Sequence, residues 1–463
     1  MMAKWHDLPS ELIYEALCYL DQPQILCVCF VSRFLLAIAE PLLYRNPDLT
    51  RRLSNGEGPA FFELRGFARQ IISRPRFAPM VCNLKIVSPD EDLYDVRPPS
   101  VFNGHHDAAD VDGLCKTDAE REDLGVVIAA MAEEGIPNAL VVDGGWWGEA
   151  VALLHHLPQL LSLSISGSNA VRLLTYAATG KLVGGVPIGL RTISHLQLVY
   201  ASATYWPDQS TLSSAVVIPF MHLSNLRTFS VHQFGGNLAR GYGVWDKIIQ
   251  RGTSSITDLR FVSSNVGSRL LNSILTLPRR LKKFEYVIRA DAAIAPSFTP
   301  SELVPGLHLH SHSLTHLAFS ADSAGEVFAA HGVMIGSLSE FTSLTYLRLP
   351  LLLLLGHPQE GVELEMATMD PIGSLLPPSL VRLELELRVW PFKEFMLVTG
   401  YPDSWLRSRR RFQCLEYFVV HRNLDIIDFE GDMGSDIKPT LAAFPDMKEK
   451  FEVAKIIVEP RVE

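Results

Sequence analysis

Four histidines lie between residues 308 and 316, and their spacing could serve metal binding. His308, His310 and His312 alternate along the chain, and His316 follows four residues later. On a strand, alternate side chains share one face, and imidazole nitrogens gathered on one face can bind Zn²⁺. No cysteine or carboxylate stands at a matching distance, so structural or solvent-exposed histidines are the alternative. We expect no metal site and no cofactor.

Two other segments could bind anions or partners. Gly144–Glu149 follows an expected strand, and glycines there can cradle phosphate, but two tryptophans and the lack of a Lys-Ser/Thr pair favour a turn. An exposed tryptophan pair could instead anchor a partner. The basic run Arg407–Arg411 fits a localisation signal, a contact with an acidic partner or a solvated connection. No nucleophile motif or catalytic triad is evident, so we expect a non-catalytic protein.

The composition is that of a folded protein, with 48% hydrophobic and 20% charged residues. A net charge of −10 argues against nucleic acid as the main partner. Most of this charge lies between residues 88 and 123, a stretch with eleven acidic and three basic residues. With its prolines and glycines, this stretch is expected to be a disordered insertion.

Neither a secretory segment nor an apolar run long enough to cross a bilayer is visible, so we expect no membrane partner. Six cysteines are scattered without paired spacing, which favours a reducing compartment. We therefore expect a cytoplasmic and/or nuclear location.

The main fold signal is a recurring apolar triplet. Nine segments share one register, with these middle anchors: Leu163, Leu196, Phe229, Leu259, Phe284, Leu317, Leu347, Leu383 and Phe418. Successive anchors are separated by 33, 33, 30, 25, 33, 30, 36 and 35 residues. This spacing is typical of leucine-rich repeats, long enough to leave room for a helix in each unit. Weaker copies lie at Leu84–Ile86, Leu140–Val142 and Phe451–Ile456.

The predicted fold class is therefore α/β, an irregular leucine-rich-repeat solenoid with a parallel concave sheet. Each repeat would supply one strand, whose leucines can be buried only against neighbouring repeats. The regular Asn or Cys that usually follows the last leucine is missing. A conventional α/β domain with leucine-rich strands is the alternative.

Ahead of the repeats, the pattern predicts three short helices. Leu12, Ile13, Ala16, Leu17 and Leu20 would share one face of the first helix, which Pro9 can begin. Asp21 and Gln24 have the spacing of a reciprocal cap for a second helix, and Ser32 can cap a third. So small a unit needs a partner, or the repeats, to complete its core.

These helices resemble the F-box, and the combination with divergent repeats resembles the large F-box families of fungi. The resemblance rests on Asp7–Ile13, Ala16–Asp21, Val31–Arg33 and Pro41–Tyr44. We predict an F-box at residues 1–48, a helical linker at 49–80 with a helix from Ala60 to Ser73, and the repeat domain at 81–463.

The resemblance implies binding to a Skp-type adaptor and, through it, to a cullin in a ubiquitin ligase. It also implies the following contacts with the adaptor: Leu8, Pro9, Leu12, Ile13, Leu17, Leu20 and Val31. For Leu12, Leu17 and Leu20, packing inside the F-box is an equal alternative.

A protein substrate would bind the residues that stand between the buried leucines on the concave face. These residues are His195, Gln197, Thr228, Ser230, Asp258, Arg260, Lys283, Glu285, His316, Tyr346, Arg348, Arg382, Glu384 and Tyr417. They are large, polar or aromatic and of mixed sign, which suits protein recognition. The alternatives to a ligase receptor are a repeat scaffold without a ligase link and an enzyme hidden in the repeats.

Overall fold

The computed structural model describes residues 8–49, 61–87, 146–167, 178, 185–199, 212, 214–236, 250–288, 300–321, 335–350, 353–354, 375–387, 417–422 and 456–460. The chain divides into two compact units, Met1–Ser210 with Ala215–Phe229 and Thr211–Ser214 with Ser230–Glu463. The predicted boundaries at residues 48 and 80 lie inside the first unit and stay predictions. The predicted acidic insertion, the Leu140–Val142 copy and Arg407–Arg411 lie outside the described residues.

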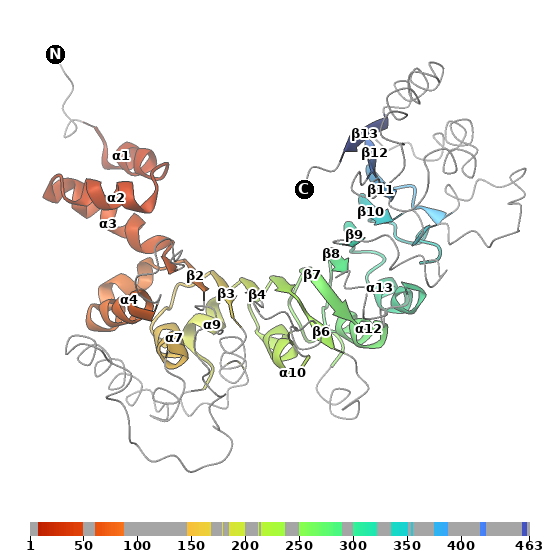
Figure 1. The fold of residues 1–463 in the computed structure, drawn as a ribbon, viewed down its shortest axis with the longest axis horizontal. Coiled ribbons are helices and arrows are strands. Elements are labelled where there is room, and N and C mark those ends of the chain that lie inside the picture. Colours follow the sequence, from red (N-terminus) through yellow and green to blue (C-terminus); the bar gives the residue numbers. More distant parts are fainter. Residues whose placement is uncertain are drawn as a thin grey trace, which may run out of the picture. The chain divides into compact units, whose positions relative to one another are not determined.

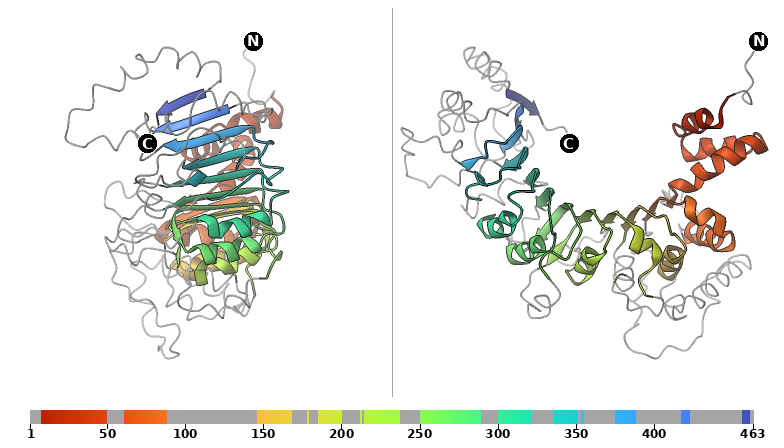
Figure 2. Two further views of the ribbon diagram at one scale, coloured as in Figure 1. Left: turned by 90° about the vertical axis from the view of Figure 1, so that its right-hand side faces the viewer. Right: turned by 180° about the vertical axis from the view of Figure 1, so that it is seen from behind.

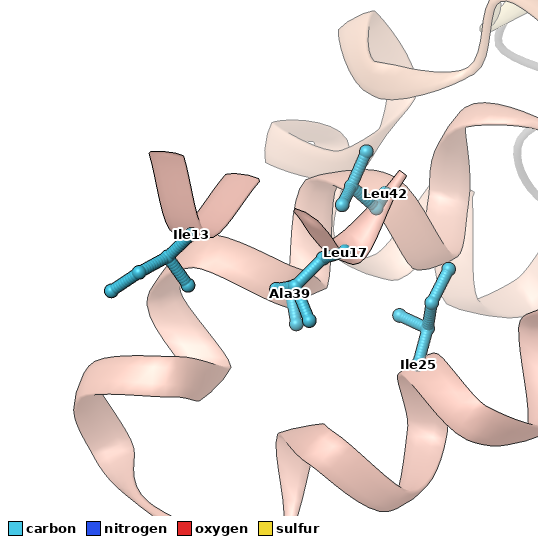
Figure 3. Packing of buried hydrophobic residues seen from close by; sticks show 5 residues of the cluster. All are labelled: Ile13, Leu17, Ile25, Ala39 and Leu42. Carbon is cyan, nitrogen blue, oxygen red and sulfur yellow. The ribbon is translucent and has the colours of Figure 1, made fainter. Parts of the chain in front are cut away.

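The first unit begins with a bundle of three helices, α1 (Ser10–Leu17), α2 (Gln22–Cys29) and α3 (Arg33–Arg45) (Figure 1). The reciprocal cap is present: the backbone N–H of Gln24 donates to Asp21, and that of Asp21 donates to the Gln24 side chain. Ser32 caps α3 by accepting the backbone N–H of Leu35 at 3.1 Å. All three helices contribute to the buried core, which comprises Ile13, Leu17, Ile25, Ala39 and Leu42 (Figure 3).

The sheet of the first unit starts directly after this bundle. Its remaining elements are β1 (Asp48–Leu49), α4 (Phe61–Ser73), the 3-10 helix η2 (Pro75–Met80), β2 (Asn83–Val87), α7 (Trp146–His155), β3 (Ser162–Ser166), α9 (Ile188–Thr192) and β4 (His195–Val199). β1 to β4 pair in order, all parallel. Two-residue β1 was not expected, because so short a strand carries no apolar alternation.

The bundle is joined to the sheet by more than chain continuity. The ring of Tyr44, in α3, stacks on Phe77 of η2 with centroids 4.4 Å apart. The Tyr44 hydroxyl accepts a hydrogen bond from Gln70 in α4 at 3.0 Å. The backbone N–H of Cys82 donates to the carbonyl of Arg45 at 3.0 Å. These contacts fix α3 against the elements that precede β2.

The second unit continues the same pattern. The division falls within β5 (Thr228–His232), which follows α10 (Ser214–Val217) and η5 (Ile218–His222). Then come β6 (Gly235–Gly236), β7 (Asp258–Val266), α12 (Ser268–Thr276), β8 (Lys283–Ile288), η6 (Pro300–Leu303), α13 (Val304–His308), β9 (His316–Ala321), β10 (Tyr346–Pro350), β11 (Arg382–Leu387), β12 (Tyr417–Arg422) and β13 (Ile456–Pro460). β7 to β13 pair in order and in parallel, as their side-by-side arrows show (Figure 2).

The apolar triplets are buried as the repeat pattern predicts. Leu317 and Phe319 of β9 are fully buried, and so are the matching residues of β8 and β10. The rings of Phe284 and Phe319 pack edge to face, 5.7 Å apart. Helices α12 and α13 lie on one side of β7–β9 (Figure 1). The predicted fold class, helices followed by a parallel repeat sheet, is confirmed.

Serine and threonine hydroxyls connect the repeats that lack a regular Asn. The carbonyl of Lys282 accepts the backbone N–H groups of Thr315 and His316 at 2.8 and 3.1 Å, and the Thr315 hydroxyl at 3.1 Å. In the next repeat, the carbonyl of Thr315 accepts two N–H groups and the Thr345 hydroxyl, each at 3.0 Å. Each strand start thus satisfies a carbonyl of the preceding repeat.

Candidate protein-binding surfaces

The N-terminal bundle exposes an unusual number of large apolar side chains. Eleven such side chains are exposed among the described residues, and eight of them lie between residues 8 and 36. These eight, called here the apolar patch, are Leu8, Leu12, Tyr19, Leu26, Phe30, Val31, Phe34 and Leu36. Tyr19, Phe30 and Val31 are 90%, 82% and 71% exposed. Large apolar side chains left exposed in one small unit are a feature of interaction sites in folded proteins.

The predicted adaptor contacts divide between the surface and the core of the bundle. Leu8, Pro9, Leu12 and Val31 are exposed. Ile13 and Leu17 are buried in the bundle core, and Leu20 is half-buried against it. Leu17 therefore packs inside the bundle, as the alternative to an adaptor contact predicted, whereas Leu12 is exposed to solvent. The prediction that these residues contact an adaptor stays a prediction.

Sequence reasoning missed Tyr19, Leu26, Phe30, Phe34 and Leu36. Leu26, Phe34 and Leu36 are exposed positions of α2 and α3, and Tyr19 and Phe30 follow the ends of α1 and α2. Exposed positions of this kind usually carry polar side chains. An apolar residue at a position that the helical period assigns to solvent was the available signal.

In the first unit, the strand positions that alternate with buried residues carry small or neutral side chains. This first polar face comprises Asn83, Lys85, Ser162, Ser164, Ser166, His195, Gln197 and Thr228. Ser164 donates to the Gln197 side chain across the strands at 3.2 Å. The hydroxyl oxygen of Ser194, just before β4, lies 2.7 Å from Nδ1 of His195. Lys85 carries the only formal charge of the set.

In the second unit, most of the corresponding positions are charged or aromatic, and Ser230 and Ala318 are exceptions. This second polar face comprises Asp258, Arg260, Lys283, Glu285, His316, Tyr346, Arg348, Arg382, Glu384 and Glu386. The strand register places Lys283, His316, Tyr346 and Arg382 in one row across β8–β11. Tyr417 continues this row on β12. The register therefore brings together most of the predicted substrate-contacting positions of this unit.

A stacked ring pair forms the centre of that row. The rings of His316 and Tyr346 are parallel within 1°, with centroids 3.9 Å apart. The guanidinium of Arg382 lies 5.8 Å from the Tyr346 centroid. Burial, and then the charge of Lys283, lowers the pKa of His316 to about 4. The imidazole is therefore neutral at pH 7.

Burial, together with the neighbouring Glu384 carboxylate, raises the pKa of Tyr346 above its ordinary value. The Tyr346 hydroxyl stays protonated at pH 7 and hydrogen-bonds Glu384.

Ion pairs organise the charges of the second polar face. Arg348 donates from Nε to Oε1 of Glu386 at 2.8 Å, and its Nη2 lies 2.7 Å from the same oxygen. Nε of Arg382 lies 2.6 Å from Oε1 of Glu384. Glu386 was missed from the sequence, because it stands one strand position beyond the Leu-x-Leu triplet.

Outside this network, Nε of Arg260 lies 3.0 Å from Oε2 of Glu285, and Nζ of Lys283 lies 4.0 Å from Oδ1 of Asp258.

The four clustered histidines have separate partners. Nδ1 of His308, in α13, lies 3.4 Å from Glu340. His310 is buried in the following turn, with Nε2 2.8 Å from the Leu275 carbonyl and Nδ1 accepting the Leu281 N–H at 3.3 Å. His312 contacts Thr342, and His316 belongs to the ring stack. Among the residues described, no three potential metal ligands come together.

The other predicted motifs lie partly outside the described residues. Gly144 and Gly145 are outside them, and Trp146 begins helix α7, so this part of the segment is helical where a turn was expected.

Comparison with known protein families supports the repeat architecture. A leucine-rich repeat domain matches residues 188–388, less than half of the chain. The match covers strands of both units and lies outside the N-terminal bundle. No curated protein matches the chain. Residues 188–388 therefore match a leucine-rich repeat domain, in agreement with the parallel repeat sheet. In the described part of the chain, no helix is long and apolar enough to cross a membrane.

Proposed function

We propose that this protein is the non-catalytic substrate-recognition subunit of a Skp–cullin–F-box ubiquitin ligase. The N-terminal bundle would bind the Skp-type adaptor, and polar strand positions of the repeats would bind a protein substrate. The mechanism is tethering, which raises the local concentration of a substrate lysine near the ubiquitin-loaded enzyme.

The apolar patch is the observation that carries the adaptor assignment. A bundle with five buried core residues leaves eight large apolar side chains exposed, an arrangement that a partner surface would stabilise by removing them from water. Leu8 and Pro9 precede α1 and are exposed, where the F-box resemblance assigns the leading contact. The contacts of Tyr44 with Phe77 and Gln70 would hold the adaptor in a fixed orientation relative to the first repeats.

A second candidate function is a leucine-rich-repeat scaffold that binds proteins without a ligase link. The repeat match at residues 188–388 favours it, because leucine-rich repeats suggest protein binding and the match does not include the N-terminal bundle. The two candidates share the substrate surface and differ only in the partner of the apolar patch.

Co-expression with a Skp-type adaptor tests the proposal. We expect the adaptor to co-purify with the full chain, and a Leu8→Ala/Pro9→Ala variant to retain about a tenth of it or less, since central apolar contacts dominate interfaces. The matched control is Leu161→Ala/Ile188→Ala, which removes two exposed apolar side chains of the first unit outside the bundle. This control should co-purify the adaptor as the wild type does.

Folding of each variant is checked by circular dichroism and thermal unfolding. If the folded wild-type chain purifies without the adaptor, the ligase-receptor proposal is wrong and the scaffold function replaces it.

A further inference from the structure

We propose that the second polar face binds an acidic, extended segment of a protein partner, with carboxylates placed near Lys283 and Arg382. This inference rests on the proposed use of the face for protein binding, and it is independent of the adaptor.

The face is formally neutral, but its charges lie at different depths. Its ten residues include four cationic and four carboxylate side chains. The side chains of Lys283, Arg260 and Arg382 are 63%, 53% and 44% exposed. Those of Glu384 and Glu386 are 5% and 2% exposed, beneath Arg348 and Arg382. Glu384 and Glu386 thus lie in the floor of the face, whereas the side chains of Asp258 and Glu285 are 28% and 29% exposed. The three most exposed charged groups of the face are therefore the cations Lys283, Arg260 and Arg382.

The depth of the charges determines the partner. A basic segment would have to reach past the arginines to contact Glu384 and Glu386, whereas an acidic segment meets Lys283 and Arg382 without displacing either. Lys283 is the most exposed cation of the face, with 63% of its side chain exposed and Nζ 4.0 Å from Oδ1 of Asp258.

The row across the strands sets the spacing. Lys283 on β8 and Arg382 on β11 are separated by three strand intervals, or about 14 Å. An extended peptide rises about 3.3 Å per residue, so two acidic residues about four positions apart would reach both cations.

Between the two cations, the ring stack of His316 and Tyr346 offers a contact for the intervening residues. Both rings are neutral at pH 7, and their mutual packing fixes their orientation before a partner binds. The stack therefore adds apolar contact area at little entropic cost and without repelling a peptide backbone.

Fluorescence anisotropy with the purified full chain tests the inference. The probe is a fluorescein-labelled Ser/Gly peptide with two glutamates about four residues apart. Matched peptides carry glutamine or lysine in their place. We expect the Glu peptide to bind at least about tenfold more tightly than the other two at low salt, and to weaken as salt rises.

The decisive variant is Lys283→Glu, with Lys282→Glu as its control. Both change the net charge equally, but Lys282 precedes β8 and is not part of the second polar face. We expect Lys283→Glu to weaken binding of the Glu peptide at least about tenfold, and Lys282→Glu to have less than a twofold effect. Lys283→Met separates loss of attraction from added repulsion.

Equal binding of the Glu and Gln peptides, preference for the Lys peptide, or equal effects of the Lys282 and Lys283 variants would overturn the inference. The adaptor co-purification assay is run on the same samples. Loss of selectivity for the acidic peptide in a chain that still co-purifies the adaptor counts against this inference alone. If the chain binds the acidic peptide selectively but does not co-purify the adaptor, the inference is supported, and the scaffold replaces the ligase receptor as the function.

Discussion

The two polar faces share one backbone pattern and carry different side chains. In the first unit, Ser162, Ser164 and Ser166 alternate with the buried residues of β3. In the second unit, the same repeat positions of β10 hold Tyr346 and Arg348. The buried positions, by contrast, are apolar in both units.

The comparison distinguishes the residues that form the repeats from those that could bind a partner. The buried leucines and the hydroxyl hydrogen bonds at the strand starts are part of the repeat structure itself. A face of mainly small, neutral side chains with one charge, at Lys85, offers little contact area and little charge, whereas the rings and cations of the second polar face offer both. We therefore expect binding to depend on the second polar face, and the first to serve mainly the fold.

The largest expected effect comes from Arg348→Met. This change leaves Glu384 and Glu386 buried without the guanidinium, so it should lower the unfolding free energy by about 3 kcal/mol, as for other broken buried pairs. Urea unfolding followed by circular dichroism measures the loss.

Arg260→Met is the matched control for Arg348→Met, because Arg260 occupies the same repeat position and pairs with Glu285 across the strands. The side chains of that pair are 53% and 29% exposed, far more than the buried glutamates beside Arg348, so we expect a loss of less than about 1 kcal/mol. Equal losses in the two variants would mean that burial of the carboxylates does not set the cost.

The repeat fold could be predicted from the sequence because its signal is dense. Nine triplets in one register predicted nine strands, and β3, β4, β5 and β7–β12 stand where the triplets are. The caps at Asp21 and Ser32 were also predictable, since each depends on residues within one helical turn. β1 was not, because its pairing with β2 comes from a contact 37 residues away.

The candidate sites were only partly predictable. Alternation along a strand identifies which side chains leave the core, but not how deep each lies or which neighbour it contacts. Glu384 was expected as an accessible polar residue, but its side chain is only 5% exposed, because Arg348 of β10 and Arg382 of its own strand pack against it. The His316–Tyr346 stack depends on the register between β9 and β10, and the two residues are 30 positions apart in the sequence, too far for a local pattern to reveal their contact.

A smaller effect is expected from the pH dependence of the second unit. The pKa of His316 is lowered to about 4 in the folded protein, so between that value and the ordinary 6.5 the unfolded chain binds more protons. The contribution of His316 to stability is therefore complete above pH 6.5 and is lost as the pH falls toward 4. His316→Phe keeps a ring against Tyr346 and should reduce the fall in unfolding free energy between about pH 7.5 and about pH 5 by about 1 kcal/mol, allowing for solvent screening.

Urea unfolding of wild type and His316→Phe at several pH values tests this expectation. Part of the fall should remain in the variant, because burial also lowers the pKa of His310. Parallel curves for the two proteins would show that His316 does not resist protonation.

The smallest effect is expected in the first unit, from Ser164→Ala. Ser164 stands at the same repeat position as Arg348, but it makes one hydrogen bond, to Gln197, at a half-buried site that water can enter. We expect a loss of about 0.5 kcal/mol in urea unfolding and no change in affinity for the Glu peptide. A loss as large as that of Arg348→Met, or weaker peptide binding, would mean that the first polar face does more than serve the fold. If the unfolding free energy and the peptide affinity both stay near their wild-type values, the first polar face serves the fold and the charged second polar face serves binding.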